Sequence, residues 1–179
     1  MKAADGERAR VFFALWPSAA LRAVLGAHAL EAQTECGGRA IVADNIHLTL
    51  FFVGAFERPQ LRALERAAET VRGEAFSLVL DTLGYWRHNR IVWVGAAHCP
   101  RQLEALAAEL RTALAAEGVA GEERPYSPHV TLVRNAERRP ASRRIAPFTW
   151  EAREFVLIES VPADGGVRYQ PLTGWRLQM

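Results

Sequence analysis

A four-residue pattern occurs twice in this chain and constrains its fold more than any other feature. His47-Leu48-Thr49-Leu50 returns as His129-Val130-Thr131-Leu132, and each copy lies in an apolar run that reads as a β-strand. Because side chains alternate between the faces of a strand, the His and the Thr of each copy should share one face. The apolar residues then take the other face and anchor it in a core. A fold that joins the two strands would gather two imidazoles and two hydroxyls in one cleft.

The rest of the chain predicts an α+β fold. Helices are expected after the possible N-cap Ser18, from Pro59 to Arg72 and along the leucine stripe from Leu103 to Leu114. The two His strands are expected to be joined by strands at residues 11–15, 76–83, 90–94, 155–160 and 169–177. The arginines at positions 138, 139, 143 and 144 are expected in a solvated loop, with contact to an anionic substrate as the alternative.

Short links between neighbouring strands favour a largely antiparallel sheet. A long helix precedes each His strand, so we expect two pseudo-symmetric lobes with helices outside and the active-site cleft between them. No linker or low-complexity segment divides the chain, and residues 1–179 are therefore expected to form one bilobal domain.

Composition excludes several classes of protein. Half of the residues are hydrophobic and 23% are charged, as in an ordinary soluble globular protein. The net charge of +2 provides no strong field for nucleic acid. No apolar run reaches the ~18 residues of a membrane span, and the polar N-terminus, residues 1–10, lacks the order of a signal peptide. Cys36 and Cys99 have no metal-type spacing, so a cytoplasmic protein without a structural disulfide is expected.

Paired imidazoles in a cleft favour acid–base chemistry. A histidine titrates near pH ~6.5, so one ring can accept a proton while the other donates one. The Thr49 and Thr131 hydroxyls can hold an anionic oxygen between His47 and His129. A phosphodiester fits this arrangement, because its hydrolysis needs activation of water, protonation of the leaving oxygen and support for the phosphoryl oxygens.

Other site chemistries are less favoured. Zinc usually takes three or four protein ligands, and no carboxylate or thiol has a ligand spacing to either histidine. A serine hydrolase is disfavoured because the chain has no Gly-x-Ser-x-Gly motif. A non-catalytic nucleotide- or RNA-binding module remains an alternative, although binding alone does not require two proton-transfer groups.

The chain resembles the two-histidine phosphoesterase superfamily, and within it the LigT-like RNA 2′,3′-cyclic phosphodiesterases, also called RNA 2′-5′ ligases. The similarity is carried by both His-x-Thr motifs and by several segments spread over nearly the whole chain. These segments are residues 10–15, 45–54, 90–95 and 127–134, with Glu159, Ser160, Tyr169 and Trp175 in the tail. One departure is Phe51, where the family pattern leads us to expect lysine or another polar residue. By strict alternation Phe51 would share the face of His47 and Thr49.

The resemblance implies metal-independent, cofactor-free hydrolysis of RNA 2′,3′-cyclic phosphate ends to 2′-phosphomonoesters, with 2′-5′ ligation in some relatives. Nothing in the sequence requires more than a monomer, and a monomer is expected. The resemblance implies that His47 protonates the leaving 3′-oxygen and that His129 activates water. It also favours a phosphate-binding role for Arg134, which strict alternation would turn away from the cleft. A two-histidine phosphodiesterase acting on 2′-5′ oligonucleotides or on small cyclic nucleotides is the enzymatic alternative.

Overall fold

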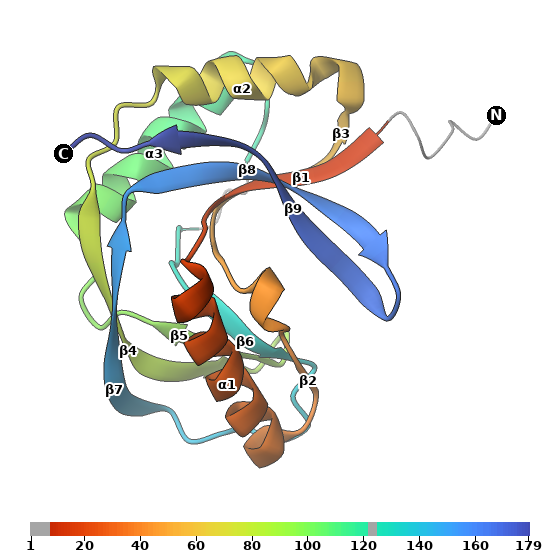
Figure 1. Ribbon diagram of the computed structural model, residues 1–179, viewed down its shortest axis with the longest axis vertical. Coiled ribbons are helices and arrows are strands. Elements are labelled where there is room, and N and C mark those ends of the chain that lie inside the picture. The colour runs from red at the N-terminus through yellow and green to blue at the C-terminus, as the bar shows by residue number, and fades with distance from the viewer. Residues whose placement is uncertain (1–7, 122–124) are drawn as a thin grey trace.

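The computed structural model describes residues 8–121 and 125–179 (Figure 1). Most of the polar N-terminus, and residues 122–124 of the polar connection that precedes Tyr126, lie outside the described residues. The described helices are α1 (Ala19–Cys36), α2 (Leu61–Thr70) and α3 (Arg101–Ala116), with short 3-10 turns η1 (Ala43–Asn45) and η2 (Arg58–Gln60). The strands are β1 (Arg8–Leu15), β2 (Arg39–Ala40), β3 (Leu48–Glu57), β4 (Phe76–Trp86), β5 (Ile91–Gly95), β6 (Val130–Arg134), β7 (Arg143–Ala152), β8 (Glu154–Ala163) and β9 (Gly166–Arg176).

The strands form one sheet in the order β7-β4-β5-β6-β3-β1-β8-β9, and β2 adds to β6. The pairings between these named strands are antiparallel, which confirms the predicted α+β class. The two His strands meet at the centre through a single pair, Leu48 opposite Val130. This narrow junction divides the sheet into two lobes, β7-β4-β5-β6 and β3-β1-β8-β9.

Each lobe is covered by a helix that follows, in the sequence, a strand of the other lobe. Helix α1 follows β1 but packs on β6, whereas α3 follows β5 but packs on β3 and α2 (Figure 1). Ser18 caps α1 by accepting a hydrogen bond from the Leu21 amide at 3.2 Å, as predicted. The buried side chains of the two lobes, among them Phe13, Leu48 and Leu132, belong to one continuous hydrophobic core. This exchange of helices links the lobes more firmly than one strand pair would.

The main difference from the sequence-based prediction is β7. Arg143 and Arg144 were expected in a solvated loop with Arg138 and Arg139, but they begin this strand, which pairs with β4. Pro147 obscured the strand, because proline in a strand is tolerated only at an edge or an irregularity. Here β7 is an edge strand, and its register with β4 shifts between Leu80 and Thr82, opposite Pro147.

Candidate active site

The four motif residues converge as the repeat predicts. His47 lies one residue before β3 and His129 one residue before β6, so the Leu48–Val130 pair holds the two histidines close together. His47, Thr49, His129 and Thr131 all line one cavity of about 400 Å³. The cavity therefore lies at the junction of the two lobes, with one His-x-Thr motif supplied by each.

Both imidazoles have the same tautomer, because each Nδ1 forms a hydrogen bond with a backbone carbonyl. His47 Nδ1 lies 2.7 Å from the Asn45 carbonyl oxygen, and His129 Nδ1 lies 2.8 Å from that of Ser127. A carbonyl oxygen only accepts hydrogen bonds, so Nδ1 carries the proton in both rings. The Nε2 atoms are thus left to exchange protons in the cavity, and His47 Nε2 accepts a hydrogen bond from Thr49 Oγ1 at 3.1 Å.

Aromatic side chains hold both imidazole rings in place. The His47 ring packs against Phe12 and edge-to-face against Tyr169, with centroid distances of 4.8 and 5.0 Å. The His129 ring lies edge-to-face against Trp86 at 4.3 Å. These contacts fix the directions of the Nε2 atoms, as a proton-transfer site requires.

A β-bulge in each His strand changes which later residues face the cavity. Thr131 lies opposite Trp93 and Val133 opposite Val92, so Leu132 is the extra residue of a bulge in β6. The bulge shifts the alternation by one position, and Arg134 returns to the face of His129 and lines the cavity. This geometry corrects the strict alternation that directed Arg134 away.

The equivalent bulge in β3 corrects the expectation for Phe51. Thr49 lies opposite Ala14, whereas Phe51 lies opposite Phe13, and these two β1 residues face opposite sides of the sheet. The Phe51 side chain is buried in the main core, although it still borders the cavity. Phe52 instead lies on the face of Thr49, where it is 40% exposed and has the Arg10 guanidinium 4.9 Å from its ring centroid.

Burial and charge favour the neutral form of both imidazoles. Burial is the main cause that lowers the pKa of His47 to about 4. The charge of Arg134 lowers this pKa further, whereas the hydrogen bond to the Asn45 backbone raises it. Burial also lowers the pKa of His129, to a smaller extent, and Arg134 acts in the same direction. His129 therefore retains a proton more readily than His47.

Two residues without an assigned role in the sequence stabilise the site. The buried Asn45 side chain donates to the Val167 carbonyl at 2.7 Å and accepts from the Tyr169 amide at 2.9 Å, which fastens β9 beside His47. Tyr126 donates to the Thr49 carbonyl at 3.1 Å, and burial raises the pKa of its hydroxyl, so it remains protonated. The only sequence signal for these roles was the position of each residue, since Asn45 comes two residues before His47 and Tyr126 three residues before His129.

The remaining histidines have other surroundings. His28 pairs with Glu31 on α1, and His98 is exposed. His88 is exposed in the turn after β4, and that turn also borders the cavity. No group of three or more His, Cys, Asp or Glu side chains in residues 8–121 and 125–179 is arranged to hold a metal ion.

The sequence and the fold of this chain are similar to those of known proteins. Residues 17–161 match the model of the 2′-5′ RNA ligase superfamily. The RNA 2′,3′-cyclic phosphodiesterase of Escherichia coli (strain K12) is 38% identical over 176 residues, which cover 96% of this chain and 98% of the relative. The protein of the same name from Thermus thermophilus is 30% identical, covering 94% of this chain and 90% of the relative.

Among solved structures, E. coli LigT complexed with 3′-AMP matches with a TM-score of 0.85 at 34% identity, covering 97% of this chain and all of the other. The bilobal fold and the paired His-x-Thr motifs together define a two-histidine site. The chain belongs to the 2′-5′ RNA ligase superfamily.

Proposed function

We propose that this chain is an RNA 2′,3′-cyclic phosphodiesterase that produces 2′-phosphomonoesters without a metal or cofactor. The observation that carries the proposal is the pair of imidazoles whose Nδ1 atoms are fixed by Asn45 and Ser127, leaving both Nε2 atoms for proton transfer in one cavity. Names of relatives that cover nearly the whole chain support the same activity.

The proposed reaction needs one proton removed and one supplied. A water oxygen attacks phosphorus and gives its proton to the neutral Nε2 of one histidine. The bond from phosphorus to the ribose 3′-oxygen breaks, and that oxygen takes a proton from the other imidazolium, which leaves the phosphate on the 2′-oxygen. Thr49, Thr131 and Arg134 hold the phosphoryl oxygens, since hydroxyl and guanidinium donors suit a phosphate.

The two histidines must lie on opposite sides of the phosphorus because attack is in line with the leaving oxygen. Since burial lowers the pKa of His47 further, His129 retains a proton more readily than His47. We therefore assign the base to His47 and the acid to His129. This order reverses the expectation from the resemblance.

The same site supports ligation when the 5′-hydroxyl of a second RNA replaces water. The base then takes the proton of that hydroxyl, the 3′-oxygen leaves as before, and the product is a 2′-5′ phosphodiester. The family match makes this the second activity to test.

RNA is the proposed partner because the cavity combines aromatic rings with a cation. Trp86 and Phe52 border the cavity together with Arg134. Bases of single-stranded RNA stack on aromatic side chains, while guanidinium groups bind phosphate. The exposed face of Phe52 therefore suits a base.

We further propose that the chain acts as one monomeric domain in the cytoplasm. The continuous core beneath both lobes supports a single domain. Cys36 and Cys99 are free thiols, as is usual in a reducing compartment. No helix among residues 8–121 and 125–179 is long and apolar enough to cross a membrane.

A product assay tests the proposed function. Nucleoside 2′,3′-cyclic phosphates and short RNAs ending in a 2′,3′-cyclic phosphate are incubated with the protein, and the 2′- and 3′-phosphates are separated by chromatography. We expect the 2′-phosphate alone. A 3′-phosphate product would contradict the proposed geometry, and binding without turnover would favour the RNA-binding alternative. Hydrolysis of 2′-5′ oligonucleotides instead would favour the second enzymatic alternative.

A further inference from the structure

Arg39 lies directly across the sheet from Arg134, and this arrangement is unusual for two cations. Strand β2 pairs with the end of β6 so that Arg39 and Arg134 are register partners. Cross-strand partners project from the same face, and like charges placed opposite one another are destabilising. The face that carries the site therefore presents two guanidinium groups, one from each of two adjacent strands. The backbones of these strands are about 5 Å apart.

The protein does not offset this repulsion with acidic side chains. Within the described part of the chain, no carboxylate forms an ion pair with Arg39 or Arg134. Other arginines of the same sheet do have acidic partners, such as Arg144 with Asp81 and Arg8 with Glu57. Arg39 and Arg134 together thus carry enough positive charge to bind a second anionic group, besides the phosphoryl group assigned to Arg134.

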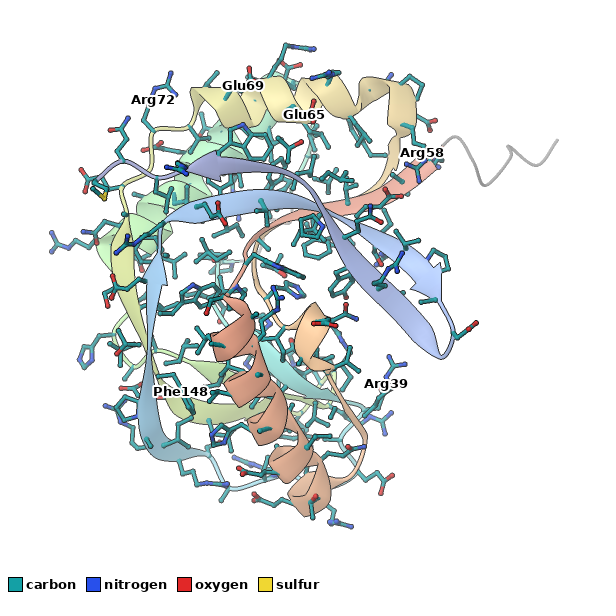
Figure 2. All side chains as sticks on the ribbon, in the orientation of Figure 1. Arg39, Arg58, Glu65, Glu69, Arg72 and Phe148 are labelled. Atoms are coloured by element: carbon teal, nitrogen blue, oxygen red, sulfur yellow. The ribbon has the colours of Figure 1, made fainter. Side chains whose placement is uncertain are left out.

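The exposed side chain of Arg39 extends toward the β8–β9 hairpin. Its Nη1 approaches Gly166 at the tip of the β8–β9 hairpin, where a Cβ on the glycine would lie 3.5 Å from that nitrogen (Figure 2). Arg39 is exposed, whereas Arg134 is half-buried and lines the cavity. On this face of the sheet, Arg134 therefore lies at the cavity and its strand partner Arg39 lies in solvent beside it.

We infer that Arg39 binds a second phosphate of the substrate, the phosphodiester on the 5′ side of the nucleotide that ends in the cyclic phosphate. This inference rests on the proposed function. When Arg134 holds the cyclic phosphate at the histidines, the RNA chain continues toward solvent, and the next anionic group meets the next cation on that face. A lone nucleoside 2′,3′-cyclic phosphate lacks this group, so Arg39 confers a preference for an RNA chain over a mononucleotide.

The test compares two substrates in the wild type and in Arg39→Gln. One substrate is a nucleoside 2′,3′-cyclic phosphate, and the other is a dinucleotide ending in the same cyclic phosphate. For Arg39→Gln we expect unchanged kcat/KM on the mononucleotide and a loss of about tenfold on the dinucleotide, mainly through KM, the order expected for one charge-assisted hydrogen bond. The salt dependence of log KM for the dinucleotide should also weaken, by about 0.7 in slope, as expected for one contact to single-stranded RNA.

Arg62→Gln is the matched control, because Arg62 is an exposed arginine on α2 that does not line the cavity. It removes the same charge and should leave both substrates unchanged. Because the Arg39–Arg134 repulsion is relieved, Arg39→Gln should unfold at the wild-type temperature or above it. Equal losses on both substrates, or no loss on the dinucleotide, would overturn the inference while leaving the phosphodiesterase proposal intact. A wild-type protein inactive on both substrates would overturn the proposed function and this inference together.

Discussion

Phe52 and Arg134 occupy equivalent positions in the two halves of the cavity. Each is the fifth residue after its motif histidine, and each is brought to the histidine face by a bulge, at Leu50 in β3 and at Leu132 in β6. The two lobes therefore contribute identical His-x-Thr pairs followed by different side chains, an aromatic ring and a guanidinium. This difference makes a nearly symmetric cavity suitable for an asymmetric substrate.

Replacing either motif histidine should abolish most turnover. His47→Ala and His129→Ala each remove one proton-transfer group, so kcat should fall by ~10²–10⁴-fold. Single-turnover assays with a cyclic-phosphate dinucleotide measure this loss. His28 and His98 lie outside the cavity, so His28→Ala and His98→Ala should remain near wild type. Comparable losses at all four positions would remove the case for a histidine pair.

The threonines should contribute less than the histidines. Thr49→Val and Thr131→Val keep the side-chain shape but remove one hydrogen bond each, and kcat/KM should fall roughly tenfold. Thr112→Val, at a position on α3 outside the cavity, is the matched control. A loss as large as that of the histidine variants would indicate that the hydroxyls take part in proton transfer.

Arg134 should affect both binding and the protonation of the imidazoles. Arg134→Ala removes a charge that lowers the pKa of His47 and of His129, so both pKa values should rise. We expect a roughly 10- to 100-fold loss in kcat/KM, from the charged hydrogen bond, and an upward shift of the alkaline limb of the pH profile. Arg134→Lys should restore the wild-type position of the alkaline limb, because lysine keeps the positive charge. It should restore only part of the activity, because lysine lacks the planar guanidinium that binds phosphate with two hydrogen bonds. An unchanged KM and pH profile in Arg134→Ala would contradict the phosphate-binding role.

The pH profile of kcat/KM should be bell-shaped with both limbs below the ordinary histidine value of about 6.5. Activity rises as the base loses its proton, near the His47 pKa of about 4, and falls as the acid loses its proton at the lowered pKa of His129. His47→Ala should retain only the descending alkaline limb, and His129→Ala only the rising acidic limb. The opposite pattern in the two variants would restore the roles that the family resemblance implies.

Turnover should not depend on a metal ion. Two histidines without a third ligand make a poor zinc site, and three-residue ligand groups are absent from residues 8–121 and 125–179. After dialysis against EDTA, kcat should equal that of the untreated protein. Inactivation by EDTA that zinc or manganese reverses would instead support a metal-dependent mechanism.

The sequence alone determined the residues of the candidate site and the class of the fold. The repeated His-x-Thr pattern indicated which side chains share a face, and the short links between strands indicated an antiparallel sheet, because both depend on local geometry. The cap at Ser18 was predictable for the same reason, since it involves residues three positions apart.

Only the tertiary structure decided how these parts act together. The bulges at Leu50 and Leu132 depend on the register with β1 and β5, so local alternation placed Phe51 and Arg134 on the wrong faces. Strand β7 requires its partner β4 and has little local signal of its own. The pKa values of the histidines follow from burial and from the charge of Arg134, and the pairing of Arg39 with Arg134 joins residues far apart in the chain. Each of these features results from contacts between distant segments, which a pattern of neighbouring residues does not specify.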